Sequence, residues 1–312
     1  MLGRSLIDID NLEDHHISDI IDLAKVFKKY FKDGALHRLV DSTKASRKLV
    51  YLFFTEPSTR TRVSFETACD RLGVKAIYLS AGRSSVAKGE TVEDTINILK
   101  ALKPDALIFR SKKLKIPMED LLSSPIPLIN AGLGTQSHPS QSLSDALTIL
   151  EDRGQIKGER VLIVGDVLHS RVAHSNVKLL SRLGAEVAYC SPKGLAPRNE
   201  VWKNFKNFDE LNEGVKWATV LVSLRVQEER HGDLLGSIGF SVAEYRDKFR
   251  IGYDQVNIFS PEGIILHPGP AIRGVEISNF ALRDSRCRIL NQVENGLYVR
   301  LALLSLILDL KV

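Results

Sequence analysis

The sequence predicts an α/β protein with two doubly wound parallel-sheet lobes joined by helices. Short apolar runs alternate with amphipathic helical patterns along the 312 residues, and these runs are apolar throughout rather than at every second position. Continuous apolar strands separated by helices are typical of parallel sheets covered on both faces. The alternation occurs twice, before and after a long helical pattern near the middle of the chain, and a chain of this length has room for two domains.

The first half of the chain contains four strand patterns. A helix is expected over about 18–32, where apolar residues recur at helical spacing and Gly34 follows as a stop signal. Further helices are expected over about 60–72, ended by Gly73, and over about 91–102. The strands are expected at Leu49–Phe54, Ala76–Leu79, Ala106–Phe109 and Pro127–Ile129.

The second half repeats the pattern after a joining helix expected over about 139–152. A further helix is expected over about 171–183, and the polar, glycine-bearing segment from about 225 to 240 is expected to be a mobile loop. We expect one domain of residues 1–137, completed by a C-terminal helix at 292–312, and a second of residues 138–291. The second set of strands is expected at Arg160–Val164, Glu186–Cys190, Val220–Leu224 and Ile264–Leu266.

The composition excludes several classes of protein. A net charge of +5 with 26% charged residues is ordinary for a soluble protein, and the densest basic run, at 111–115, has no aromatic residues near it, so nucleic-acid binding is not expected. Three widely spaced cysteines without a C-x-x-C motif imply neither a disulfide framework nor a zinc site, and they fit a reducing cytoplasm. No signal peptide is expected at the amino end, which has acids and histidines in place of an apolar stretch, and the apolar segment at 297–310 is too short to span a membrane and carries Arg300.

The polar run Ser58, Thr59, Arg60 and Thr61 lies where a strand turns into a helix. Backbone N–H groups and the helix dipole favour an anion there, hydroxyls add small donors, and an arginine adds a fork that fits phosphate oxygens. The competing interpretation is a helix N-cap with surface charge. Because one cap needs one hydroxyl and the run has three around an arginine, the sequence favours a phosphate site.

Two further positions of the first half follow strands. Arg110 comes at the end of an apolar strand, where the carboxyl ends of parallel strands form the ligand crevice. His138, before Pro139, would lie at the start of the joining helix as a neutral imidazole able to polarise a carbonyl oxygen, with Gln141 one turn on. His138 could equally be structural. Lys88, beside Gly89, either reaches an anion from a loop or belongs to a solvated surface.

The second half suggests a carboxylate site rather than a dinucleotide site. Gly165 is a single glycine where the dinucleotide fingerprint needs three, so an NAD-linked oxidoreductase is disfavoured. Arg171 and Arg225 each follow a buried strand, with Gln227 on the side of Arg225 by strand alternation, and two arginines suit a dicarboxylate. The Pro268-Gly269-Pro270 run is either a tight turn or a set of outward carbonyl acceptors, because prolines cannot donate.

In this order and over nearly the whole chain, the motifs S-T-R-T-R, S-x-x-x-K-G-E-T, H-P-x-Q, G-D-x-x-x-x-R, R-V-Q and H-P-G-P resemble the aspartate/ornithine transcarbamoylase family. R-V-Q and H-P-G-P are similar to the aspartate-using branch, whereas ornithine-using relatives typically have an H-C-L-P turn and an S-M-G loop. The resemblance implies transfer of the carbamoyl group of carbamoyl phosphate to the amine of L-aspartate, giving N-carbamoyl-L-aspartate and phosphate in de novo pyrimidine biosynthesis.

The resemblance also implies the roles of the site residues, in a site between the lobes and at the subunit interface. The first domain would bind carbamoyl phosphate and the second aspartate. Arg60, Arg110 and His138 would be catalytic, drawing on the carbonyl oxygen of carbamoyl phosphate. That substrate would be bound by Ser58, Thr59, Arg60, Thr61, Arg110, His138, Gln141, Pro268, Gly269 and Pro270, and aspartate by Lys88, Arg171, Arg225 and Gln227.

Other implications concern assembly. Ser84 and Lys88 would enter the site from the adjacent subunit, which implies a homotrimer, and neither a metal nor an organic cofactor is expected. Association with regulatory chains or a dihydroorotase stays open. The chain departs from the family pattern at Leu133, where Asp is usual, and at Ser137, where Gln is usual; we expect altered hinge packing or a changed partner surface there rather than lost chemistry.

Two alternative functions remain. A transcarbamoylase for a different amino substrate is the nearest, because the acceptor half is less fully specified. A non-catalytic paralogue that scaffolds a pyrimidine-pathway enzyme would have lost ligand-reaching residues. All six of the expected ligand-reaching residues are present: Arg60, Lys88, Arg110, His138, Arg171 and Arg225.

Overall fold

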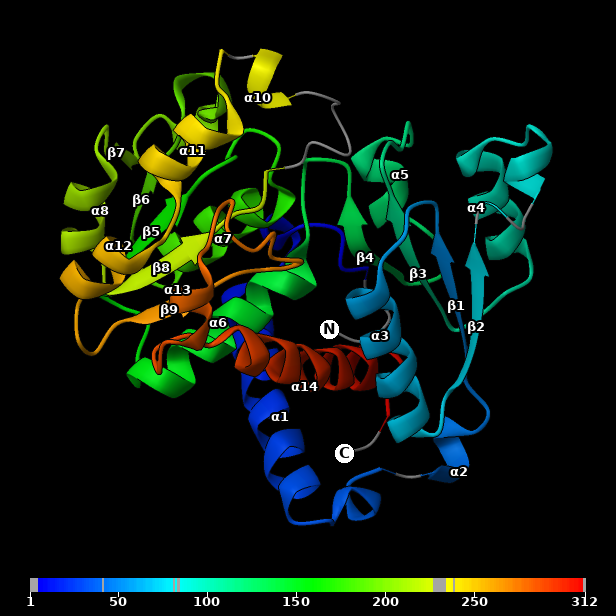
Figure 1. Cartoon of the computed structure of the whole chain (residues 1–312). Coiled ribbons are helices and arrows are strands. Elements are labelled where there is room, and N and C mark those ends of the chain that lie inside the picture. The colour runs from blue at the N-terminus through cyan, green and yellow to red at the C-terminus, as the bar shows by residue number, and fades with distance from the viewer. Residues whose placement is uncertain are drawn as a thin grey trace. The chain divides into compact units, whose positions relative to one another are not determined.

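The computed structural model describes residues 5–40, 42–80, 82, 85–226, 234–237 and 239–310. The chain divides into two compact units, the first made of Met1–Ser144 and Val293–Val312 and the second of Asp145–Gln292. Helices α6 (Pro139–Arg153) and α14 (Ile289–Ile307) each contribute to both units. Each unit has its own all-parallel sheet, which confirms the predicted fold class (Figure 1).

The first unit has a four-stranded parallel sheet in the order β2-β1-β3-β4. Strand β1 lies between β2 and β3, with Phe53 opposite Leu79 on one side and Phe109 on the other, so its run of apolar residues is buried. The elements of this unit are η1 (Ile9–Asn11), α1 (Asp14–Lys32), η2 (Leu36–Arg38), α2 (Ser42–Ala45), β1 (Leu49–Phe54), α3 (Thr59–Leu72), β2 (Lys75–Ser80), η4 (Ser85–Lys88), α4 (Val92–Ala101), β3 (Ala106–Ser111), α5 (Met118–Leu122) and β4 (Leu128–Leu133).

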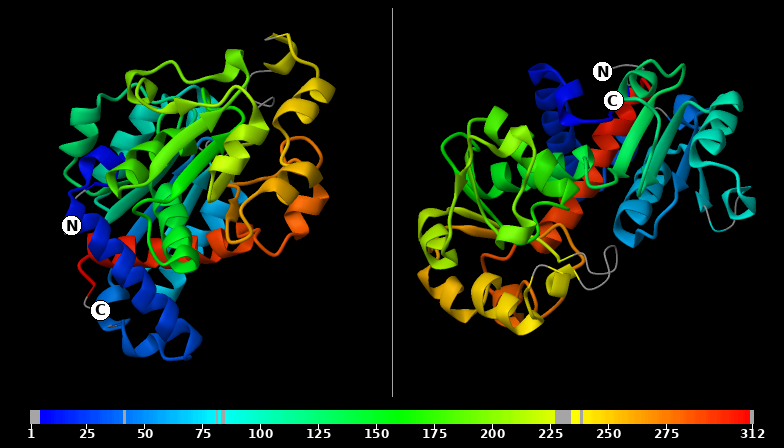
Figure 2. Two further views of the ribbon diagram at one scale, coloured as in Figure 1. Left: turned by 90° about the vertical axis from the view of Figure 1, so that its left-hand side faces the viewer. Right: turned by 90° about the horizontal axis from the view of Figure 1, so that it is seen from above.

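Helices cover this sheet and fix the start of α3. Alternate strand residues such as Phe53 and Phe109 pack with Ile96 of α4 and Leu121 of α5 in one apolar cluster. Helix α14 contacts α3, because Arg300 donates to Ser64 Oγ at 2.9 Å and lies 5.1 Å from the Phe65 ring centroid. Helix α14 also packs against α1, where Lys28 Nζ donates to Asn295 Oδ1 at 2.7 Å (Figure 2).

The second unit has a five-stranded parallel sheet in the order β7-β6-β5-β8-β9. The chain moves from β5 outward to β7 and then returns to β8 on the other side of β5, so the strand order reverses between β5 and β8. The elements are β5 (Arg160–Val164), α7 (Arg171–Arg182), β6 (Glu186–Cys190), η5 (Lys193–Leu195), η6 (Glu200–Trp202), β7 (Lys206–Asn207), α8 (Leu211–Trp217), β8 (Val220–Ser223), α10 (Leu234–Ser237), α11 (Val242–Phe249), α12 (Tyr253–Ile258), β9 (Ile264–Leu266) and α13 (Asn279–Arg283).

One side of this second sheet carries a continuous apolar cluster. Strand residues such as Leu162 and Leu221 pack with Val215 of α8, Tyr245 of α11 and Val256 of α12. Gly214 permits the close packing of α8, since a Cβ at that position would come within 2.8 Å of a Leu162 methyl group. The cluster holds the carboxyl ends of β5 and β8 in place, and these are the ends that precede the predicted arginines.

The predicted elements differ from the observed ones mainly at their ends. Helix α1 begins at Asp14, four residues earlier than expected, because the Glu13 N–H donates to His16 Nδ1 at 3.3 Å in a capping box that the apolar spacing does not reveal. Strands β3 and β4 are longer than expected and end at Ser111 and Leu133, so Arg110 lies inside β3 rather than after it. Half of the predicted mobile loop, at 227–233 and 238, lies outside the described residues.

None of the described helices has the length and apolarity to cross a membrane.

The cysteines provide a test of burial. Burial, with a smaller effect of Glu66, raises the pKa of the Cys69 thiol from 9.0 to about 12. Burial, with Glu210 and Asp209, raises the pKa of Cys190 likewise to about 12. Both thiols therefore stay protonated near neutral pH. Below pH 9 their titration does not reduce the free energy of unfolding. As the pH rises from 9 towards 12 the unfolded chain loses these protons more readily than the folded protein, so the fold becomes less stable.

We expect a thiol reagent at pH 8 to leave Cys69 and Cys190 of the folded protein almost unmodified and to label both rapidly in urea. Half-buried Cys287 is the internal control and should react first. Mass spectrometry of the labelled peptides measures this order. Labelling of Cys69 or Cys190 in the folded protein at the rate seen in urea would contradict it.

Candidate functional site

The N–H groups at the start of α3 in the first unit have no partner within the helix. Ser58 occupies the N-cap position with an extended backbone, but its side chain makes no capping hydrogen bond. Intrahelical bonding begins with the N–H of Arg62, which donates to the Ser58 carbonyl at 3.3 Å, so the N–H groups of the first turn have no partner within the helix. The simple N-cap interpretation therefore does not account for Ser58, and the helix start can bind an anion.

The two arginines of this turn have different surroundings. Arg62 donates to Glu66 Oε1 at 3.0 Å, and its guanidinium lies 3.6 Å from the Tyr78 ring centroid. Arg60 is exposed at the first turn, whereas Thr61 is buried. Arg62 thus belongs to the surface packing of α3 on β2, and Arg60 is the arginine that the turn presents to solvent.

Arg110 is held by a buried carboxylate that the sequence analysis missed. Its Nε lies 2.7 Å from Glu56 Oε1, and Arg110 Nη1 donates to the Ala131 carbonyl at 3.1 Å. The Glu56 side chain is 3% exposed and that of Arg110 is 11% exposed. Only Pro57 separates Glu56 from the S-T-R-T-R motif, and this closeness in sequence is the signal by which Glu56 could have been found. The pair fixes the guanidinium at the carboxyl end of β3.

His138 lies immediately before α6 and is buried. Its carbonyl accepts the Gln141 N–H at 3.0 Å, which places Gln141 in the first turn, and its Nδ1 lies 3.5 Å from Ser140 Oγ. The two unusual residues nearby are buried as well. Ser137 Oγ accepts from Asn130 Nδ2 at 2.8 Å and donates to the Ile7 carbonyl at 3.2 Å. Leu133 packs in the apolar cluster beside α4 and α5.

The arginines of the second unit follow its two central strands. Arg171 is the first residue of α7 and is buried, after Ser170 caps the helix by accepting the Ala173 N–H at 3.1 Å. Arg225 follows β8 by two residues and is half-buried. Both arginines therefore belong to the carboxyl ends of β5 and β8, where the strand order reverses and ligands of such sheets bind.

Gly165 serves internal packing in this structure. It has a φ of +113°, and a Cβ there would come within 2.6 Å of Tyr245 Oη and 3.0 Å of the Leu224 carbonyl. Burial raises the pKa of the Tyr245 phenol well above its usual value, so this hydroxyl stays protonated. The close approach of Tyr245 and Leu224 therefore explains the glycine at this position.

The turn after β9 is held by side chains that the sequence analysis also missed. His267 Nδ1 accepts the Gly269 N–H at 2.8 Å, and His267 Nε2 lies 3.0 Å from Glu276 Oε1. Gln292 accepts the His267 N–H at 2.8 Å and donates to Asp145 at 2.8 Å. The buried side chains of His267 and Gln292 therefore hold the backbone of this turn in place.

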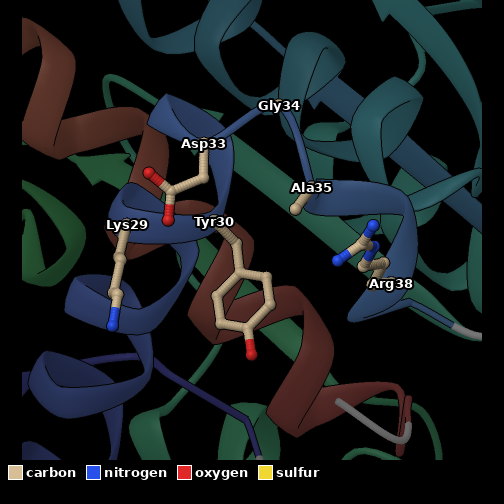
Figure 3. Close-up of a pocket in the computed structure, with 6 residues that line it drawn as sticks. All are labelled: Lys29, Tyr30, Asp33, Gly34, Ala35 and Arg38. Carbon is tan, nitrogen blue, oxygen red and sulfur yellow. The ribbon is translucent and has the colours of Figure 1, made fainter.

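Some predicted residues cannot be placed. Ser84 and Gln227 lie outside the described residues, and of Lys88 only the backbone, at the end of η4, is described. Nowhere in the described ranges do three or more His, Cys, Asp or Glu side chains gather as metal ligands would. A hollow of about 350 Å³ at the end of α1, lined by Lys29, Tyr30 and Arg38 among others, includes none of the predicted site residues (Figure 3).

Comparison with known proteins places both units in one family. Residues 4–151 match the family model described as "Aspartate/ornithine carbamoyltransferase, carbamoyl-P binding domain", and residues 157–307 match "Aspartate/ornithine carbamoyltransferase, Asp/Orn binding domain". The aspartate carbamoyltransferase catalytic subunit of Solibacter usitatus is 41% identical over 305 residues, which cover 97% of this chain and 98% of that protein.

Two solved structures are similar over nearly the whole chain. Aspartate transcarbamoylase from Trypanosoma cruzi, in complex with carbamoyl phosphate, has a TM-score of 0.85 at 27% identity, with 98% of this chain and 96% of that chain covered. Ornithine carbamoyltransferase from Pyrococcus furiosus has a TM-score of 0.84 at 31% identity, with 99% and 98% covered.

The Glu56–Arg110 pair leads to a prediction about stability. Glu56→Gln leaves a nearly buried guanidinium without its carboxylate, which should lower the free energy of unfolding by about 3–5 kcal/mol. The matched control is Glu66→Gln, which breaks the half-exposed pair with Arg62 and should cost less than about 1 kcal/mol. Urea unfolding of both variants measures the difference. Equal losses would show that Glu56 does not compensate a buried charge.

Proposed function

Because the chain belongs to the aspartate/ornithine carbamoyltransferase family, we propose that it transfers the carbamoyl group of carbamoyl phosphate to the amine of L-aspartate. The products are N-carbamoyl-L-aspartate and phosphate, and the reaction belongs to de novo pyrimidine biosynthesis. The observation that carries the proposal is the match at 41% identity, over nearly the full length of both chains, to a protein named as an aspartate carbamoyltransferase catalytic subunit.

The acceptor substrate needs an argument of its own, since an ornithine enzyme has a similar fold. Two motifs favour aspartate. R-V-Q begins at Arg225, and H-P-G-P begins at His267, where the ornithine branch typically has H-C-L-P. Arg171 and Arg225 at neighbouring strand ends are two fixed cations, which suit the two carboxylates of aspartate better than the amine side chain of ornithine.

In this proposal the first unit binds the phosphate end of carbamoyl phosphate. The first-turn N–H groups of α3, with Ser58, Thr59, Arg60 and Thr61, hold the phosphate. Arg110 and His138, together with Arg60, draw on the carbonyl oxygen, and the absence of a capping bond from Ser58 supports its use by a ligand. Gln141 and the carbonyls of Pro268, Gly269 and Pro270 take the amide. Lys88, Arg171, Arg225 and Gln227 hold aspartate.

The chemistry proceeds without a covalent enzyme intermediate. The aspartate amine attacks the carbonyl carbon and forms the new C–N bond of a tetrahedral intermediate. The bond to the phosphate oxygen then breaks, phosphate leaves with the electron pair, and the amine proton passes to the phosphate. The side chains contribute by positioning two anions and by stabilising the charge that develops on the carbonyl oxygen.

We further propose a cytoplasmic homotrimer in which Ser84 and Lys88 complete the site of the adjacent subunit. The free thiols of Cys69, Cys190 and Cys287 fit a reducing compartment.

Carbamoyl transfer by the purified protein tests the proposed function directly. We expect product with aspartate and none above background with ornithine. Arg60→Ala should lower turnover by at least about 100-fold, since it removes a cation from the phosphate and the developing oxyanion. Arg62→Ala is the matched control, because Glu66 and Tyr78 already occupy its guanidinium, and it should keep substantial activity. Transfer to ornithine instead, or equal losses in the two variants, would overturn the assignment.

Shared sites predict complementation between inactive variants. Lys88→Ala and Arg110→Ala chains, each inactive alone, should regain some activity when they are unfolded together and refolded as a mixture. A trimer that contains both kinds of chain has sites in which an intact Lys88 meets an intact Arg110. Activity of the mixture is compared with that of each variant refolded alone. If no ratio of the two chains restores activity, the proposed sharing is wrong.

A further inference from the structure

The turn His267-Pro268-Gly269-Pro270 exposes backbone acceptors but no backbone donors. Its two prolines have no N–H group. The His267 N–H donates to Gln292 Oε1 at 2.8 Å, and the Gly269 N–H donates to His267 Nδ1 at 2.8 Å. In the part of the chain that the structure describes, no group donates to the carbonyls of Pro268 and Gly269. A ligand that meets this turn therefore meets carbonyl oxygens alone.

The ring of His267 is what removes the last donor. Because Nδ1 accepts the Gly269 N–H, Nδ1 carries no proton, and the ring proton is on Nε2. Nε2 can then donate to Glu276 Oε1 at 3.0 Å, and the same oxygen accepts the Ile272 N–H at 2.6 Å. The side chains of His267 and Glu276 are 0% and 1% exposed. Glu276 thus holds the ring in the tautomer that engages Gly269.

The other N–H group of the turn is held by a separate buried network. Gln292 Nε2 donates to Asp145 Oδ1 at 2.8 Å, which turns the amide oxygen of Gln292 toward the His267 N–H. Asp145 Oδ2 accepts from Asn176 Nδ2 at 2.9 Å. Asn176 belongs to α7, the helix that begins with Arg171, so the turn and this arginine share one buried support.

From these contacts we infer that His267 determines specificity by keeping the turn free of backbone donors, so that the site selects an acyl phosphate whose acyl group carries an NH2. The inference rests on the proposed function, in which Pro268 and Gly269 face the amide of carbamoyl phosphate. Two carbonyl acceptors can accept hydrogen bonds from the two N–H groups of a carbamoyl group, whereas the methyl group of an acetyl group has no hydrogen bond to donate to them. An unengaged Gly269 N–H would instead oppose the amide and attract anions.

Two phosphonates test this selection, because phosphonoacetamide and 2-oxopropylphosphonate differ only in an NH2 or a CH3 group. Their dissociation constants are measured by calorimetry for the wild type, His267→Asn and His267→Gln. Asn can place an oxygen near the position of Nδ1 and keep the bond to Gly269, whereas Gln places its amide near Nε2 and loses that bond. Thermal unfolding of each variant serves as the control for folding.

We expect His267→Gln to raise the dissociation constant of phosphonoacetamide by about tenfold or more, and to change that of 2-oxopropylphosphonate by less than about threefold. His267→Asn should preserve most of the wild-type preference. If His267 had a purely structural role, His267→Gln would weaken the binding of both phosphonates by the same factor. Equal losses of affinity for the two phosphonates, or no loss for either, would overturn the inference.

Measurements on the unmodified protein keep the test decisive if His267→Gln does not fold. The ¹⁵N shifts of the His267 ring should report the tautomer protonated on Nε2, and the Gly269 amide should be protected from hydrogen exchange without ligand. A ring protonated on Nδ1, or an unprotected Gly269 amide, overturns the inference. Carbamoyl transfer by the wild type is assayed in parallel: its absence rejects the proposed function, whereas its presence with an unchanged preference in His267→Gln rejects this inference alone.

Discussion

The ion pair between Arg110 and Glu56 shows the constraint on which the proposed site depends. A cation that is to act on a ligand at the end of a buried strand must be kept charged and in one orientation before the ligand arrives. In water the guanidinium would be solvated and mobile, and in an apolar interior it would be too costly to bury alone. A carboxylate at 2.7 Å and a carbonyl at 3.1 Å solve both problems. The same pair lowers the net positive charge of the site, so the remaining attraction for a phosphate comes from Arg60 and from the start of α3.

In the second unit a buried charge is likewise held in one orientation, but here the charge is a carboxylate and its partners are neutral amides. Asp145 is fully buried and accepts one amide N–H on each oxygen, from Asn176 and from Gln292. Removing either amide would leave a carboxylate oxygen of a fully buried residue with one donor fewer, which is expensive in a low dielectric. The two amides are therefore held as firmly as the carboxylate itself. They connect α7 to the turn after β9, and the geometry of that turn follows from packing in the core rather than from the turn residues alone.

Sequence patterns predicted the strands, the two lobes and the positions of the polar clusters because these depend on local periodicity. Strand β1 was predicted with its observed bounds, and Gly73 does end α3, with a φ of +73°. The residues that support the proposed site were not predicted, because Glu56 and Asp145 gain their meaning from partners far away in the chain. The His267–Glu276 pair spans only nine residues, but it lies across an irregular turn that periodicity does not describe. Asp145 and Gln292 are 147 positions apart, and no spacing rule joins them. Glu56, the residue before Pro57, follows β1 and lies beside Arg110 because β1 and β3 are neighbours in the sheet.

The start of α3 in the first unit and the turn at 267–270 in the second unit offer opposite hydrogen-bonding groups. The start of α3 is rich in donors: first-turn N–H groups, hydroxyls and Arg60. The turn at 267–270 has acceptors only. A phosphate at the turn would lie against carbonyl oxygens and be repelled. An NH2 group at the start of α3 would place its own N–H donors against the donors of the helix. A phosphate is therefore matched by the start of α3, and an NH2 group is matched by the turn at 267–270. The absence of backbone donors from the turn rests on the buried side chains of His267 and Gln292, so it does not depend on how any one surface side chain moves.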